Sequence, residues 1–352
     1  MPGLFDPLTI GPYRLRNRVV MAPLTRQRAE AVRVPNALMA EYYRQRATAG
    51  LIISEATAVM PMGVGYADTP GIWSDEQVEG WKLVTDAVHQ EGGLIFCQLW
   101  HVGRISDPYF LDGETPVAPS AIAAPGEVSL LRPKRPFVMP RALEISEIPA
   151  IVEAYRQGAI NAHKAGFDGV HVHGANGYLL AQFLEDGSNH RTDAYGGPIE
   201  NRARLMLEVV DAAISVWGAG RVGLHLSPGS AVHGMKDSDP AATYGYVVRE
   251  MAKREIAFIC AREQRKEGWL APALKRQFGG VYIVNESFDR DSAIAALAAG
   301  EADAVAWGKA FIANPDLPAR LAGNAALNTP DPDTFYAPGP KGYVDYPSLS
   351  VA

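Results

Sequence analysis

The stretch GVHVHGANGYLLAQFLED, residues 169–186, combines a strand, a turn and the start of a helix. Small and β-branched residues fill its first part, Gly-Ala-Asn-Gly is a turn signal, and the apolar run after Tyr178 predicts a helix. Because side chains alternate along a strand, His171 and His173 share one face, and Asn176 and Tyr178 follow just beyond it. Four polar groups therefore lie close together just past one strand end. They could form a metal site or a catalytic site, or they could be ordinary residues at the end of a strand.

Similar apolar runs recur along the chain, and amphipathic helical segments separate most of them. The eight predicted strands are 18–23, 51–59, 93–100, 169–174, 221–228, 256–261, 281–285 and 303–308. Helical spacing of apolar residues is clear in 75–92, 145–166, 199–218 and 289–300. Alternating strands and helices predict parallel pairing, and eight such units in 352 residues favour an α/β fold of the (β/α)8 TIM-barrel type. The lack of GxGxxG after the first strand argues against an open dinucleotide-binding sheet.

One proline-rich excursion interrupts this alternation, at about residues 104–149. It leaves the carboxyl end of the third predicted strand, which is the side of a barrel where active sites lie. Long loops in compact domains are usually functional, so we expect this segment to cap the pocket. The chain as a whole, residues 1–352, is predicted to form a single domain.

The composition is that of an ordinary globular protein, with 47% hydrophobic and 20% charged residues. A net charge of −6 offers no basic surface to a phosphate backbone, so we expect no nucleic-acid partner. The sequence has no secretory signal and no run of about 18 uncharged apolar residues, which predicts neither secretion nor a membrane span. Cys97 and Cys260 lie in apolar runs and are predicted to be buried thiols, as in the reducing cytoplasm.

Polar residues also end other predicted strands. Thr25 follows the first strand, Gln98 and Trp100 lie on the third, and His225 lies on the fifth. Each of these has an ordinary interpretation when taken alone, as a helix N-cap, a hydrogen-bonded core residue or a satisfied core histidine. At one face of one barrel, however, they join the histidines of the fourth strand as a candidate active site.

Long motifs carry a resemblance to a known family. They are NRVVMAPLTR (17–26), GYADTPGIWSDEQVEGWKLVTDAVHQEGG (65–93), QLWHVGR (98–104), HGANGYLLAQFLEDGSNHRTDAYGGPIENRARL (173–205), FIANPDLPARL (311–321) and GYVDYPSL (342–349). Through them the chain resembles the old yellow enzyme family of FMN-dependent ene-reductases, from residue 4 to residue 349. Two further stretches, EIAFICAREQR (255–265) and GGVYIVNESFDRDSA (279–293), are most similar to its xenobiotic and nitrate-ester reductases.

The resemblance implies a barrel that binds FMN non-covalently and takes hydride from NADPH or NADH. Its substrates would be α,β-unsaturated carbonyl compounds with an activated C=C bond, together with nitro compounds or nitrate esters. The protein would be a monomer or a homodimer.

The resemblance also implies a role for each matching residue. Tyr178 would donate a proton, which a phenol with a pKa of about 10 retains at neutral pH. His173 and Asn176 would bind the substrate oxygen. The walls of the substrate pocket would be Tyr66, Trp100, His173, Asn176 and Tyr343. The cofactor-binding residues would be Pro23, Leu24, Thr25, Ala56, Gln98, His225, Glu286, Ser287, Gly308 and Lys309.

Four of the residues depart from the common pattern of the family. His171 stands where many members have Glu, and Lys309 replaces a common Arg, which keeps the charge but loses the bidentate fork. His225 replaces an Arg, and it can stabilise negative charge on the flavin only as a cation or as a neutral donor. Glu286 occupies a usually small, neutral position and would repel the phosphate unless its side chain turned to solvent.

Two alternatives stay open at this point. A zinc-dependent barrel hydrolase could use His171, His173 and His225 as ligands, although the His-x-His pair falls on the fourth strand and no carboxylate or lysine ligand is apparent. A barrel that binds flavin without turnover would have no need of His173, Asn176 and Tyr178 together. Flavin colour that a nicotinamide cofactor bleaches and an enone restores separates the reductase from both.

Overall fold

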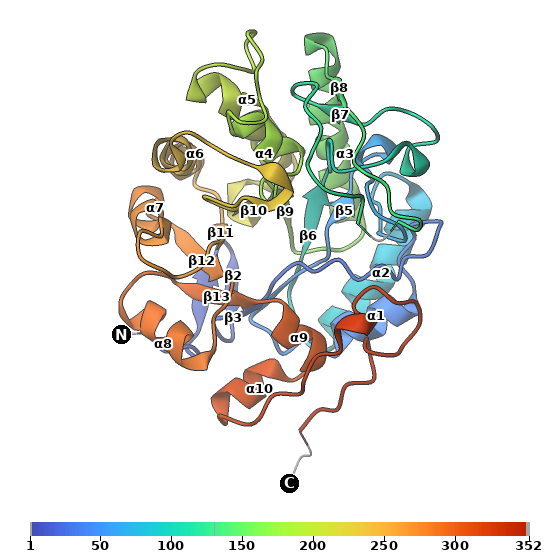
Figure 1. The fold of residues 1–352 in the computed structure, drawn as a ribbon. Helices are drawn as coiled ribbons and strands as arrows, with labels where there is room; N and C mark the ends of the chain where they lie inside the picture. Colours follow the sequence, from blue (N-terminus) through green and yellow to red (C-terminus); the bar gives the residue numbers. More distant parts are fainter. Residues whose placement is uncertain (1, 130, 350–352) are drawn as a thin grey trace.

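The structure is a computed structural model that describes residues 2–129 and 131–349, and its centre is a closed barrel of eight parallel strands (Figure 1). These strands are β3 (Val19–Met21), β4 (Leu51–Ile53), β6 (Ile95–Trp100), β9 (Gly169–His173), β10 (Val222–Leu226), β11 (Phe258–Arg262), β12 (Val281–Asn285) and β13 (Ala304–Trp307). The ring closes where β13 pairs with β3, with Val305 opposite Val19. The predicted (β/α)8 barrel is therefore confirmed, with all eight of its strands.

Helices form an outer ring around these strands, as Figure 1 shows. They are α1 (Ala37–Arg44), α2 (Asp75–Gln90), α3 (Ile148–Lys164), α4 (Leu179–Leu184), α5 (Ile199–Trp217), α6 (Pro240–Arg254), α7 (Ala271–Phe278), α8 (Arg290–Ala298), α9 (Lys309–Ala313) and α10 (Leu317–Ala322). Local sequence sets where several of them begin. Ser74 before α2 and Asp289 before α8 each form a capping box, which satisfies backbone N–H groups that the helix leaves free.

Most strand boundaries differ from the prediction by one to three residues, and two of the differences affect the site. The second predicted strand is split into β4 and the short β5 (Thr57–Ala58), because the chain leaves the ladder at Ser54, whose Oγ accepts from the Gln98 N–H at 3.0 Å. The sixth barrel strand, β11, runs one residue beyond the predicted end and so includes Arg262. Arg262 thereby reaches the rim of the barrel.

The amino end of the barrel is covered by a hairpin that the sequence analysis did not anticipate. It consists of β1 (Leu8–Ile10) and β2 (Tyr13–Leu15), which pair antiparallel. Ile10 and Leu15 are buried in one apolar cluster with Phe96 and Phe258 at the start of the barrel strands. The hairpin closes this end, which leaves the carboxyl ends of the strands as the open face.

The proline-rich excursion packs at that carboxyl face. It contains a two-stranded parallel sheet of β7 (Val117–Ala118) and β8 (Arg141–Ala142). Its residues Val128, Leu131 and Phe137 share an apolar cluster with Trp100 at the end of β6 and with Tyr66. The short 3-10 helices of the structure are Pro61–Gly63, Pro108–Phe110, Ile145–Glu147, Ala219–Arg221, Val232–Gly234 and Pro332–Thr334.

Two further expectations can be compared with the structure. Cys97 and Cys260 are both buried and both free, as predicted. Among the helices of the described ranges, none combines the length and the apolar character that a membrane crossing requires.

Candidate active site

Two adjoining cavities lie at the carboxyl ends of the barrel strands, where the sequence predicted the site. The smaller, about 80 Å³, is lined by Pro23, Thr25, Ala56, Gln98, Trp100, His173, Asn176, Tyr178 and His225. The larger, about 550 Å³, is lined by Ala22, Pro23, Leu24, Asn176, His225, Arg262, 285–288, 306–310 and Tyr336. Pro23, Asn176 and His225 border both cavities, so the two lie side by side and together bring in nearly every predicted site residue.

Like Tyr66, Tyr343 is predicted to wall the substrate pocket but lines neither of the two cavities. Its ring is buried and stacks on Tyr42 with centroids 4.1 Å apart. Arg26 Nη2 donates to the Gly342 carbonyl at 2.8 Å, which holds this segment inside the protein. The aromatic residue of the C-terminal segment that borders the larger cavity is Tyr336, which no motif in the sequence indicated.

A glutamine side chain lies within hydrogen-bond distance of two histidine rings inside the barrel. Gln98 Nε2 lies 3.2 Å from His171 Nδ1 and 3.2 Å from His225 Nδ1. Burial lowers the pKa of both histidines, that of His225 to about 3, so both rings are neutral at physiological pH. With the amide placed this way, the two Nδ1 atoms accept and each ring carries its proton on Nε2. His225 Nε2 is buried without a hydrogen-bond partner in the described ranges, so it is a neutral donor for a ligand.

Asn176 is fixed on three sides. Its φ of 56° lies in the left-handed region, which Asn tolerates better than most residues. Its N–H donates to Ser227 Oγ at 2.8 Å, and its carbonyl accepts from His233 Nδ1 at 2.8 Å. Its side-chain Oδ1 accepts from Arg262 Nη1 at 3.1 Å. Nδ2 is the one polar atom of Asn176 that has no hydrogen bond within the described part of the chain.

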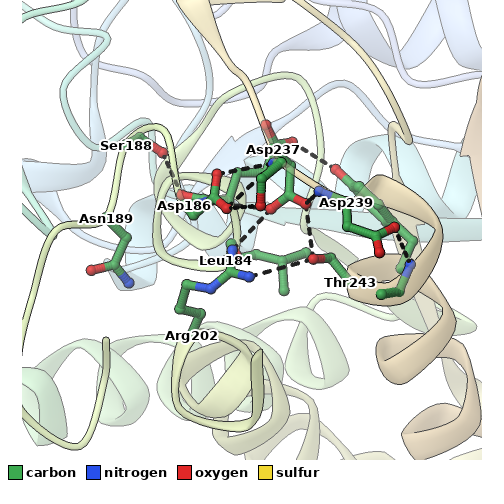
Figure 2. Close-up of polar contacts among 12 residues, drawn as sticks. Leu184, Asp186, Ser188, Asn189, Arg202, Asp237, Asp239 and Thr243 are labelled. Atoms are coloured by element: carbon green, nitrogen blue, oxygen red, sulfur yellow. Dashed lines mark hydrogen bonds and ion pairs between the residues drawn. The ribbon is translucent and has the colours of Figure 1, made fainter. Parts of the chain in front are cut away.

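The loop that carries Ser227 and His233 is anchored by a buried ion pair, drawn in Figure 2. Arg202 Nη1 donates to Asp237 at 2.9 Å, and the two side chains are only 6% and 2% exposed. Thr243 Oγ1 donates to the same carboxylate at 2.9 Å. Because Asp237 thus bonds to α5 and α6 at once, the loop is held firmly against the barrel, and with it both backbone partners of Asn176.

His173 supplies a second donor beside Asn176. Its Nδ1 accepts a hydrogen bond from the Ala175 N–H at 3.3 Å. Burial, with the nearby His225, lowers the pKa of His173 well below its usual value, so the ring is neutral and its proton lies on Nε2. The small cavity is therefore bordered by two residues that each offer an N–H, His173 Nε2 and Asn176 Nδ2. Such a pair suits the oxygen of a carbonyl group.

Tyr178 stands opposite these donors as the N-cap residue of α4. Its ring packs edge-on against Trp100 and against His173, with centroids 5.0 Å apart in each case. Its hydroxyl lies 3.0 Å from the hydroxyl of Tyr66, whose own ring stacks on Trp100 one layer behind the cavity. Burial raises the pKa of Tyr178 to about 12, and a hydrogen bond from Tyr66 opposes the rise. Tyr178 therefore retains its proton at neutral pH.

The far end of the larger cavity combines an ion pair with free backbone donors. Glu286 does not turn to solvent but to Arg262, whose Nε and Nη2 lie 2.8 and 3.3 Å from its carboxylate oxygens. Arg262, which the sequence analysis did not single out, thereby offsets the charge of Glu286. Lys309 is exposed, and the backbone N–H groups of Lys309 and Ala310 form no hydrogen bond with the described residues. These groups suit a phosphate.

The residues present fit FMN. The buried His225 Nε2 has no partner in the described chain, and Thr25 borders the same cavity beside Gln98, as a flat ring with a polar edge requires. The donors around Lys309 lie at the other end, where the phosphate tail would lie. A metal ion fits less well, because residues 2–129 and 131–349 contain no group of three or more His, Cys, Asp or Glu placed to hold one.

Known proteins with the same architecture are numerous. The family model for NADH:flavin oxidoreductase / NADH oxidase matches residues 3–328. The chain is 44% identical to a probable flavin mononucleotide-dependent alkene reductase of Leishmania infantum, over 98% of this chain and 97% of the relative. It is 44% identical to a putative 12-oxophytodienoate reductase of Oryza sativa subsp. japonica, over 98% of this chain and 93% of the relative. Morphinone reductase in complex with tetrahydroNAD superposes with a TM-score of 0.96 at 50% identity, over 100% and 99%. An old yellow enzyme homologue from Zymomonas mobilis does so with a TM-score of 0.96 at 45% identity, over 99% and 100%.

Proposed function

The chain belongs to the NADH:flavin oxidoreductase / NADH oxidase family, and from this membership we propose how its residues carry out the reaction. It is an FMN-dependent oxidoreductase of the old yellow enzyme kind, which reduces activated C=C bonds with a nicotinamide cofactor as hydride donor. FMN, when bound, supplies the hydride relay between the nicotinamide and the substrate. This membership decides against the zinc hydrolase.

His173 and Asn176 bind the carbonyl oxygen of an α,β-unsaturated substrate. The observation that carries this proposal is the pair of N–H donors, His173 Nε2 and Asn176 Nδ2, that the fixed partners of both side chains leave for the small cavity. Two donors on one oxygen draw electron density away from the conjugated C=C bond and stabilise the negative charge that develops on the oxygen. The β carbon thereby becomes the hydride acceptor.

Tyr178 delivers the proton that completes the reduction. Its hydroxyl borders the same cavity and is protonated at neutral pH, so it can transfer the proton to the substrate α carbon. Tyr66, 3.0 Å away, donates a hydrogen bond to the oxygen that remains. The product is the saturated carbonyl compound.

The residues around the two cavities hold the cofactor. Thr25, Gln98 and His225 bind the polar edge of the flavin, with His225 acting as a neutral donor in place of a cation. Pro23, Leu24 and Ala56 pack along the ring. The phosphate site consists of Glu286, Ser287, Gly308 and Lys309, mainly through their backbone N–H groups.

The finer features follow the same resemblance. We propose NADPH or NADH as donor, nitro compounds or nitrate esters as further substrates, a cytoplasmic location, and a monomer or homodimer. Residues 1–352 form one domain in which 104–149 caps the pocket; Val128 and Phe137 pack in one cluster with Trp100, which supports the cap. Trp100 and Tyr66, whose rings stack on each other, form the aromatic wall of the substrate pocket.

Phenol binding to the FMN-loaded protein tests the oxygen site directly, because a phenol oxygen resembles the polarised carbonyl. The variant His173→Ala/Asn176→Ala should keep its flavin but bind phenol about 10- to 100-fold more weakly, from the loss of two hydrogen bonds. It should also lose most of its enone turnover. The matched control is His190→Ala, an exposed histidine away from the cavities. Unchanged phenol affinity in the double variant would remove the proposed role of both residues.

A further inference from the structure

Arg262 connects two residues that belong to opposite ends of the site. Its Nε and Nη2 hold the Glu286 carboxylate at 2.8 and 3.3 Å, in the bidentate fork that a guanidinium favours. The remaining nitrogen, Nη1, donates to Asn176 Oδ1 at 3.1 Å. The three side chains come from the end of β11, the loop after β12 and the turn after β9, so only the folded barrel brings them together.

We propose that Arg262, held in place by Glu286, is a positioning residue that fixes the orientation of the Asn176 amide. This inference rests on the proposed role of Asn176 in binding the substrate oxygen. A carboxamide presents either its oxygen or its NH2 group to a ligand, and the torsion that exchanges the two is broad and roughly two-fold. Arg offers only donors, so it can bond only to Oδ1, and Nδ2 is then the group left for the substrate.

The backbone of Asn176 cannot perform this selection. Its bonds to Ser227 and His233 fix the main chain but leave the side-chain amide free to turn. Without Arg262, the amide oxygen would face the substrate oxygen for part of the time, and two acceptors repel each other. The guanidinium therefore determines whether this position attracts or repels the substrate.

Glu286 completes the arrangement from the other side. Its φ of 97° places the backbone in a region that a non-glycine residue rarely adopts, so the surroundings must hold it there. The ion pair with Arg262 is only partly exposed, at 33% and 29% for the two side chains. The carboxylate offsets part of the positive charge beside Asn176. The hydrogen bond to Oδ1 gives Arg262 a specific effect on the amide in addition to its field on His173 and Tyr178.

A double-mutant cycle on the FMN-loaded protein tests this inference, with phenol as the probe and calorimetry as the readout. Arg262→Met/Glu286→Gln removes the guanidinium and the carboxylate together, which avoids an unpaired charge. It should weaken phenol binding about tenfold when Asn176 is present and leave the phenol affinity unchanged in an Asn176→Ala background. Phenol affinity is measured per FMN-loaded chain, because Glu286 also belongs to the proposed phosphate site.

Three results would overturn the inference. Equal weakening in both backgrounds would mean that Arg262 acts on the ligand by charge, and no weakening in either would mean that the contact is inert. Loss of FMN with the affinity of the loaded fraction unchanged would make Arg262 a cofactor residue. If Asn176→Ala alone leaves phenol affinity unchanged, the proposed function of Asn176 fails as well, so the two failures are distinguishable.

Glu286→Gln alone gives a second measure that does not depend on the folding of the Arg262 variant. It keeps the guanidinium but loosens its hold, so phenol binding should weaken by a smaller factor, about two- to threefold, and only when Asn176 is present. Wild-type affinity in this variant would show that Glu286 does not hold Arg262 in its working position.

Discussion

Replacing Tyr178 by Phe separates the proposed proton donor from the packing around it. The ring keeps its edge-on contacts with Trp100 and His173, both at 5.0 Å, so the variant should fold and retain FMN. The only group lost is a hydroxyl that lies 3.0 Å from the hydroxyl of Tyr66. Leaving Tyr66 without this partner should cost about 1–3 kcal/mol of stability, or a few degrees of melting temperature.

The kinetic effect should fall on one half-reaction only. Oxidation of NADH or NADPH needs no proton from Tyr178, so its rate should stay within a few-fold of wild type. Reduction of an enone needs a proton at the α carbon, and loss of a positioned general acid slows such a step by about 10²–10⁴. Because the pKa of Tyr178 is about 12, this group should leave the wild-type enone rate independent of pH from about pH 6 to about pH 9.

Anaerobic stopped-flow measurements at the flavin absorption band record the two half-reactions separately. Quinones, which accept hydride without a proton on carbon, should be spared most of the loss. Tyr195→Phe is the matched control, because it also removes a hydrogen-bonded tyrosine hydroxyl, here one that bonds to Glu208 away from the cavities. An enone rate in Tyr178→Phe equal to that of wild type would show that solvent or another group supplies the proton.

Three further predictions follow from the same contacts. Thr25→Ala removes a hydrogen-bond donor worth about 1–3 kcal/mol, so potentiometry should find a lower reduction potential for the bound flavin. Flavin reduction by the nicotinamide should then slow, and flavin oxidation by the enone should become faster. An unchanged potential would show that the Thr25 hydroxyl does not bond to the flavin. Tyr66→Phe removes the hydrogen bond that opposes the raised pKa of Tyr178, so reduction of the enone alone should slow by about tenfold. An unchanged rate of enone reduction would show that Tyr66 only packs beside the site. Burial raises the pKa of Glu55 from 4.5 to about 7, so the native state binds more protons than the unfolded state in this interval, and its stability falls as pH rises through it by roughly 3 kcal/mol. Denaturant titrations from about pH 5 to about pH 8 should show this fall in wild type and a flatter profile in Glu55→Gln; parallel profiles would contradict the assignment to Glu55.

The fold was predictable because its signals are local. Each barrel strand is a short apolar run, and each main helix has apolar residues at three- and four-residue spacing, so neighbouring residues alone determine the period. The hairpin of β1 and β2 escaped prediction because its strands are three residues each, and their half-exposed pattern is too short to read. The split of the second strand depends on Ser54 meeting Gln98, a contact across two strands.

The sequence predicted those residues of the site that belong to recognisable motifs. The run through His173, Asn176 and Tyr178 places these residues at one strand end, and the structure brings them to one cavity. Tyr336 borders the larger cavity and lies outside every recognised motif. Arg262 lies within the quoted stretch 255–265, but one residue past the predicted end of its strand, so it was not singled out. A charged residue at a strand end of a barrel was the available signal for Arg262. Tyr343 belongs to a recognised motif, but its ring packs on Tyr42 and lines neither cavity.

The sequence by itself therefore determined the barrel, its open face and the residue types available there, since these depend on periodicity and on short motifs. Only the tertiary structure decided the state of each group. Gln98 assigns the histidine tautomers across 73 and 127 residues of chain, and Arg262 orients Asn176 across 86. Burial, which only the closed barrel creates, keeps those histidines neutral and Tyr178 protonated. A hydrogen bond depends on distances of about 3 Å between groups far apart in sequence, and no local pattern encodes such a distance.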